Sequence, residues 1–169
     1  MIPRSILDRL NAGDRSRRLA SLAALLPGSA FPPPDPRYIN NHIHTDYSFS
    51  PYSPTAAVFA AKAEGLCTAG IVDHDTIAGA EEFIAAGSIA GLPVTIGIET
   101  RVSMEGTPFE RLRTNNPDQA GVSYMVLHAV PHRNIGMVQE YFAPLRVHRN
   151  ARNRKMLDNI NRLTGLKLD

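Results

Sequence analysis

Five side chains that can bind a metal ion lie at or just after the ends of four predicted strands. They are His42, His44, His74, Glu99 and His128. Imidazole nitrogen and carboxylate oxygen, without thiolate, suit Zn²⁺, Mn²⁺ or Fe²⁺, and a glutamate can bridge two ions. Two or three such ions held together can activate water for hydrolysis. The residue types therefore predict a hydrolytic metal centre with two or three divalent ions.

The spacing of these residues indicates that they act together. His42 and His44 are two apart at the end of a predicted strand, so the period of two points both imidazoles to the same side. Taken alone, each residue has an ordinary structural explanation, such as a hydrogen-bonded histidine or, for Asp75, a helix N-cap. Those explanations do not account for a pattern that recurs at four successive strand ends, and metal binding is the favoured interpretation.

Strands and helices alternate through the part of the chain that carries these residues. Hydrophobic patterning predicts strands over 38–44, 69–72, 93–98 and 123–130, and helices over 54–65, 76–90 and 144–164. Residues 104–121 are expected to form a long loop, and 166–169 the start of another strand. Alternation predicts an α/β fold with parallel strands joined by crossovers, whose carboxyl ends gather at one rim.

The N-terminal part of the chain has a different pattern. Residues 1–30 are expected to be a helical segment, with helix over 5–26 interrupted near 11–13 and stopped at Pro27 and Gly28. Residues 31–37 contain four prolines and are expected to be an extended linker. Residues 38–169 are then expected to form the metal-dependent hydrolase domain.

Composition excludes several classes of protein. Of 169 residues, 43% are hydrophobic, and 18 Lys+Arg balance 16 Asp+Glu, so there is no strong field for nucleic acid or a membrane surface. No apolar run approaches the roughly 20 residues of a membrane span, so no membrane partner is expected. The single cysteine, Cys67, excludes an internal disulfide and fits a reducing compartment. We expect a cytoplasmic protein.

Four motifs resemble, in order and spacing, the first motifs of the PHP (polymerase and histidinol phosphatase) superfamily. They lie at residues 41–45, 71–79, 97–99 and 127–128, and the resemblance extends from Tyr38 to the end of the chain. It implies a distorted (β/α)₇ TIM-like barrel, here truncated after about four βα units, with a multinuclear metal centre that hydrolyses phosphoesters. It also implies that His42, His44, His74 and His128 are metal ligands and that Glu99 bridges. By the same likeness, Asp73 and Asp75 support the ligands from behind.

The chain departs from the superfamily pattern in two places. Phe49 stands where members often carry a further Asp or His ligand. A later His and an Asp-x-His pair would lie beyond Asp169. We therefore expect the chain to be the front portion of a longer protein, in preference to a half barrel whose ligands another chain completes.

The expected activity is hydrolysis of a small phosphomonoester or a short nucleotide by metal-activated water. Arg101, two residues past Glu99, is the first candidate to hold the phosphate oxygens, because guanidinium binds them with a fork of donors. His132 is a candidate for proton transfer to the leaving group. The basic run 146–155 could contact nucleic acid, although the solvated face of a helix is the favoured interpretation. The oligomeric state stays open.

Two other functions fit the same residues. A catalytically impaired, metal-binding regulatory domain is suggested by Phe49 and by the missing late ligands. A metal-dependent amidohydrolase is the third interpretation, because rim histidines and carboxylates also serve C–N hydrolysis.

Overall fold

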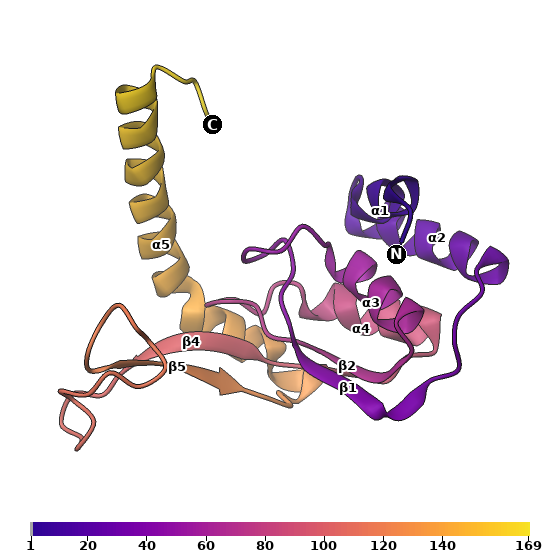
Figure 1. The fold of residues 1–169 in the computed structure, drawn as a ribbon, viewed down its shortest axis with the longest axis horizontal. Coiled ribbons are helices and arrows are strands. Elements are labelled where there is room, and N and C mark those ends of the chain that lie inside the picture. Colours follow the sequence, from indigo (N-terminus) through magenta and orange to yellow (C-terminus); the bar gives the residue numbers. More distant parts are fainter. Residues whose placement is uncertain (1) are drawn as a thin grey trace.

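Three parallel strands form the sheet that carries most of the predicted ligands. In the computed structural model, which describes residues 2–169, the sheet order is β1 (Asp35–Ile43), β2 (Leu66–Ile71), β3 (Val94–Ile96). The helices α3 (Pro54–Ala63) and α4 (Ala80–Ala90) connect these strands and cover one face of the sheet (Figure 1). Ser53 begins α3, because its side chain accepts a hydrogen bond from the Ala56 amide and Pro54 follows it. Mixed α/β structure is thus confirmed.

The predicted strand over 93–98 is in fact two strands that belong to different sheets. β3 ends at Ile96 and β4 (Ile98–Ser103) begins after Gly97. A Cβ at position 97 would overlap the carbonyl oxygen of Leu127 and press on the Val72 side chain, so only glycine fits this junction. The chain therefore passes from one sheet to the next without a crossover helix.

The fourth predicted strand was expected to be parallel, and this was wrong. β5 (Val122–Leu127) pairs with β4 in antiparallel register, with Glu99 opposite Val126 and Arg101 opposite Tyr124. The segment 104–121 between them is a loop, as predicted, and it contains no helix that could carry the chain back for parallel pairing. Residues 2–169 accordingly form a three-stranded and a two-stranded sheet and no closed barrel.

The N-terminal segment is helical and packs on the sheet helices. α1 (Arg4–Asn11) and α2 (Arg15–Leu25) are interrupted at 12–14, and a 3₁₀ turn, η1 (Leu26–Gly28), follows. Leu10 and Leu22 are fully buried and belong to the same hydrophobic core as α3 and α4. β1 begins at Asp35, inside the segment predicted as a linker.

The last two helices and the C-terminal tail also differ from the prediction. α4 begins at Ala80 instead of residue 76, because Asp75 has a left-handed backbone (φ 55°) and the Ala80 amide closes a turn onto the Ile77 carbonyl. α5 (Ile135–Thr164) follows the 3₁₀ turn η2 (His132–Asn134) and contains Pro144, which was expected to start the helix. Residues 166–169 form no strand, because the Asn161 side chain bonds to the Leu168 backbone and holds this tail against the helix.

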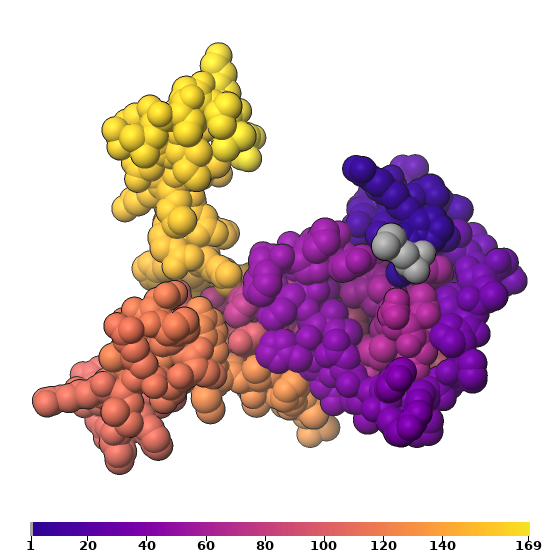
Figure 2. Space-filling view, in the orientation of Figure 1, coloured from indigo at the N-terminus to yellow at the C-terminus, as the bar shows by residue number. Residues whose placement is uncertain are grey.

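α5 leaves the body of the molecule near its midpoint. Its first residue, Ile135, is buried in the core, whereas its C-terminal half stands away from the sheets (Figure 2). Within residues 2–169, no helix is both long enough and apolar enough to cross a membrane.

Candidate metal centre

The carboxylate of Glu99 is the point on which three histidines converge. Its Oε2 atom lies 3.0 Å from Nε2 of His42, 3.3 Å from Nε2 of His44 and 3.8 Å from Nε2 of His74. The ligand atoms of His42, His44 and Glu99 all lie within 4.8 Å of one another. The structure therefore brings together four of the five predicted ligands.

The two sheets meet at this cluster. His42 and His44 stand at the end of β1, where Ile43 is in register with Ile71 of β2. His74 follows β2 and forms an isolated parallel bridge to Glu99 at the start of β4. The Glu99 amide donates to the Asp73 carbonyl, and its carbonyl accepts from the Asp75 amide. Backbone pairing thus holds Glu99 beside the strand ends that carry the imidazoles.

Buried Asp73 organises the loop after β1. It is 1% exposed and accepts hydrogen bonds from the Thr45 amide, the Thr45 hydroxyl and the Ser48 hydroxyl, each at 2.6 Å. The Ser48 proton is therefore engaged, and its oxygen, 3.4 Å from Nδ1 of His44, is left to accept from that nitrogen. We assign the proton of His44 to Nδ1, which leaves the Nε2 lone pair directed at Glu99.

This arrangement fits a bound cation. Nε2 of His44 and Oε2 of Glu99 are both acceptors, and two acceptors 3.3 Å apart repel unless a cation or a proton lies between them. The donor set of imidazole nitrogens and one carboxylate suits a divalent transition ion. His42, His44 and Glu99 would hold such an ion, with His74 beside them.

The electrostatics of the site keep two imidazoles neutral. Burial lowers the pKa of His44, and the neighbouring His74 lowers it further. Burial also lowers the pKa of His74; Glu99 opposes that shift and Arg149 adds to it. Both rings are consequently in the neutral, ligand-competent form near pH 7.

Phe49 covers the histidines where a further ligand was expected. Its ring centroid lies 4.7 Å from that of His44 and 5.1 Å from that of His74, and His74 also meets the edge of Tyr124 at 5.7 Å. The outer face of Phe49 is open, because 69% of the residue is exposed. The ring contributes no donor atom, so it shields the imidazoles from water on this side.

Arg149 of α5 is a site residue that sequence reasoning assigned to a solvated helix face. Its Nη1 atom donates to the His74 carbonyl at 3.0 Å and to Oδ2 of Asp75 at 2.9 Å. Thr100 of β4 donates to the other oxygen of Asp75. The only sequence signal for this role was the basic run 146–155, because the contact depends on where α5 leaves the body.

Arg101 faces the same side of the β4–β5 sheet as Glu99. It stands two residues along β4, and its cross-strand neighbour is Tyr124, whose ring touches His74. An open pocket of about 350 Å³ adjoins the histidines here. It is lined by Phe49, His74, Asp75, Arg101, Tyr124, Arg149 and Arg152. Three guanidinium groups and one carboxylate, that of Asp75, line this pocket, which we call the anion pocket.

Two predicted site residues lie apart from the cluster. His128 follows β5 and is exposed, and it is absent from the ligand group formed by the described residues. His132 lies in η2 and is also exposed. The β4–β5 pairing explains the position of His128, because antiparallel register sets Leu127 opposite Ile98, so His128 lies beyond the paired end of β5.

The chain is similar to two known proteins over part of their length. A 5'-3' exoribonuclease of Haemophilus influenzae is 37% identical over 65 residues, which are 38% of this chain and 24% of that protein. A crystal structure from Bifidobacterium adolescentis, described as a candidate metal-dependent phosphoesterase, superposes with a TM-score of 0.56 at 24% identity. That match covers 75% of this chain and 40% of the other, so the chain spans less than half the length of either relative.

The family model of the PHP domain matches residues 40–166, which include the converging histidines and Glu99. This match extends over most of the sequence. The chain therefore belongs to the PHP domain family.

Proposed function

We propose that this protein is a metal-dependent phosphoesterase that hydrolyses a phosphomonoester or a short nucleotide with metal-activated water. The observation that carries the proposal is the convergence of three imidazole nitrogens on one oxygen of Glu99, beside a pocket with three arginines. The single free thiol, Cys67, accords with a cytoplasmic place of action.

Two groups of the protein's own residues would take part directly in the reaction. His42, His44 and Glu99 would hold the ions, and His74 lies beside them. His128, which lies apart from this group, is proposed as a further ligand. The proposed ions are two or three of Zn²⁺, Mn²⁺ or Fe²⁺. Bound divalent ions supply a lowered water pKa and neutralise charge on the phosphate oxygens. Arg101 and Arg149 face the anion pocket, where guanidinium groups orient a phosphate by charge-assisted hydrogen bonds.

Phe49 and the Ser48–Asp73 pair would support that chemistry without touching the reacting atoms. The aromatic ring keeps water from one side of His44 and His74. Ser48 keeps Nδ1 of His44 occupied, so that Nε2 remains available as a ligand. His132 stays a proposal for proton transfer; it would require movement of the turn before α5.

The proposal is tested by metal analysis and by an ester panel. Purified protein should contain at least one tightly bound transition ion per chain and should hydrolyse chromogenic phosphomonoesters, phosphodiesters or short oligonucleotides with added Mn²⁺ or Zn²⁺. Bound metal without turnover would favour the regulatory alternative, which Phe49 suggests. Turnover of amides but of no phosphate ester would favour the amidohydrolase.

The anion pocket gives a sharper test. Arg101→Ala should lower kcat/KM about ten- to a hundredfold, because a hydrogen bond to a charged group contributes on the order of 1.5–3 kcal/mol. Metal content should not change, since Arg101 is not in the ligand group. Arg4→Ala, at an exposed position on α1, is the matched control. Equal kcat/KM for Arg101→Ala and the control would remove Arg101 from the mechanism.

A further inference from the structure

The loop 45–53 carries the side chains that pack directly behind the metal ligands. In the first half of the loop, Thr45 and Ser48 donate hydrogen bonds to Asp73. Phe49 follows them and packs its ring against the imidazoles of His44 and His74. The loop is closed by backbone bonds from Asp46 to the Tyr52 carbonyl and from Ser48 and Ser50 to the Thr45 carbonyl. The position of Ser48 and Phe49 therefore depends on how the second half of the loop is held.

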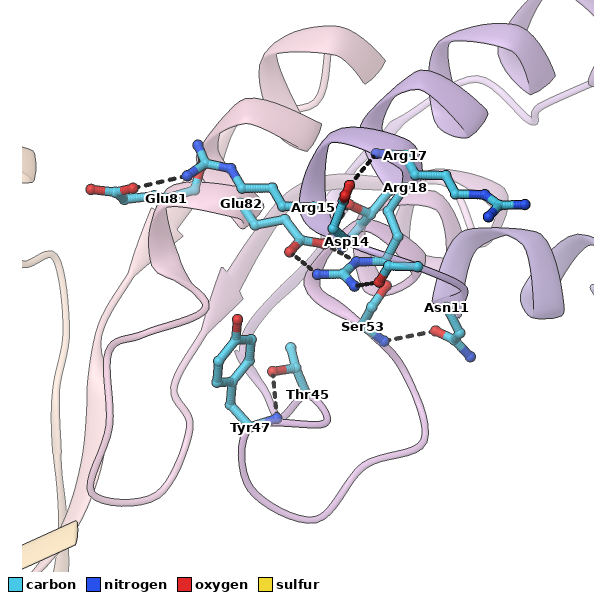
Figure 3. A network of polar contacts seen from close by, with 12 residues as sticks. Asn11, Asp14, Arg15, Arg17, Arg18, Thr45, Tyr47, Ser53, Glu81 and Glu82 are labelled. Carbon is cyan, nitrogen blue, oxygen red and sulfur yellow. Dashed lines mark hydrogen bonds and ion pairs between the residues drawn. The ribbon is translucent and has the colours of Figure 1, made fainter. Parts of the chain in front are cut away.

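That second half is held by the C-terminal end of α1 (Figure 3). The Asn11 side chain accepts from the Ser53 amide at 2.8 Å and donates to the Pro51 carbonyl at 2.9 Å. The Ser53 hydroxyl donates to the Leu10 carbonyl at 2.7 Å, and Leu10 is fully buried. One amide side chain thus satisfies a donor and an acceptor of the loop, as a backbone partner would.

A second anchor joins α2 to the first turn of α3, directly after the loop. Arg18 contacts both oxygens of Glu82, at 2.8 and 2.5 Å, and Glu82 accepts from the Thr55 hydroxyl at 2.7 Å. Glu82 is 2% exposed, so this ion pair is shielded from solvent. α1 and α2 are therefore fixed to the same body that carries the histidines, and α1 can act as a rigid support.

From these contacts we infer that α1 is a positioning element of the metal centre, with Asn11 as its positioning residue. Asn11 holds the loop 45–53 closed, and the closed loop keeps Ser48 against Nδ1 of His44 and Phe49 against the two imidazoles. Both N-terminal helices precede the segment that the family model covers, residues 40–166. The support therefore comes from residues outside the matched range. The inference rests on the metal centre of the proposed function.

The experiment compares Asn11→Ala, Asn11→Asp and the control Asn159→Ala, an exposed asparagine on α5. Metal affinity is measured with Zn²⁺ and Co²⁺ by competition with a chromophoric chelator, and the visible absorption of Co²⁺ reports ligand geometry. Asn11→Ala should weaken binding about tenfold and alter the Co²⁺ spectrum, since residues that support ligands from behind typically contribute factors of 10–100. The metal affinity of Asn11→Asp should lie between those of Asn11→Ala and the wild type, because the aspartate keeps the acceptor for the Ser53 amide and loses the donor to the Pro51 carbonyl.

Hydrogen exchange in the metal-free protein separates this inference from the proposed function. Asn11→Ala should speed exchange of the Asp46, Ser48 and Ser50 amides while the amides of β2 keep their protection. Metal affinity and a Co²⁺ spectrum equal to those of the wild type would overturn the inference, whatever happens to exchange. A wild-type protein that binds no metal would overturn the proposed function. In that case, unchanged exchange of the loop amides in Asn11→Ala would also show that Asn11 does not hold the loop 45–53.

Discussion

Glu99→Gln is the most direct test of the metal centre, because it changes one atom type and leaves the backbone in place. The Glu99 carboxylate supplies one of the three ligand atoms that lie within 4.8 Å of one another. Its backbone bonds to Asp73 and Asp75 do not involve the side chain, so the strand pairing should persist in the variant. A loss of metal can then be read as a loss of the ligand.

The expected magnitude follows from the number of ligands. Structural zinc sites with four ligands bind with about 10–16 kcal/mol, which is on average about 2.5–4 kcal/mol for each ligand. Glutamine keeps a neutral oxygen at nearly the same position and can still act as a weaker ligand. We therefore expect the loss of binding free energy to be at the lower end of this range. Each 1.4 kcal/mol is a factor of ten, and the affinity should therefore fall by roughly two powers of ten.

Metal affinity is measured by chelator competition, and circular dichroism and thermal unfolding verify the fold. Glu105→Gln is the matched control, because Glu105 lies exposed in the loop between β4 and β5. The control should bind metal like the wild type. If Glu99→Gln binds Zn²⁺ within threefold of the wild type while remaining folded, Glu99 is not a ligand and the proposed centre is wrong.

Two further predictions concern stability. Arg18→Met should lower the free energy of unfolding by about 3 kcal/mol, because it leaves buried Glu82 with Thr55 as its remaining partner. The melting temperature should fall by roughly 6–12 °C. Arg15→Met removes an exposed pair with Glu81 and should cost less than about 1 kcal/mol; equal losses in the two variants would contradict a special role for the buried pair. The pKa values of His44 and His74 are lowered by burial, so just below their ordinary value of about 6.5 the folded protein binds fewer protons than the unfolded chain. Metal-free protein should therefore lose stability as the pH falls from about 7 toward 5, measured by urea unfolding with chelator present. Replacement of both histidines by glutamine should flatten this dependence, whereas replacement of exposed His148 should leave it unchanged.

Much of the candidate site could be predicted from residue types and spacing. His42 and His44 share a side of β1 because side chains alternate along a strand, and this holds whatever the strand pairs with. His74 follows β2, and neighbouring parallel strands end at the same edge, so its approach to the first pair also follows from local pattern. The helical N-terminal segment, its interruption and its stop were likewise readable from local signals.

The direction of the last two strands could not be predicted in this way. A run of β-branched residues favours a strand without indicating whether the strand pairs in parallel or antiparallel register. In the structure, the backbone packs closely against Leu127 at Gly97, where the chain passes from β3 into the antiparallel β4–β5 sheet. That turn leaves Glu99 in the cluster and His128 outside it. It also sets Arg101 beside Tyr124, which no spacing along the sequence would suggest.

By itself, the sequence determined which side chains can offer metal-ligand atoms near the ends of strands, because residue type and the period of two along a strand are local properties. The tertiary structure alone decided which distant groups support those side chains. Asn11 and Arg149 lie on helices that are remote in sequence from the histidines, and they reach the loop 45–53 and Asp75 because buried apolar side chains, such as Leu10 and Ile135, seat those helices on the core. Packing of this kind is a property of the whole folded chain, so no local pattern shows which partner either residue will contact.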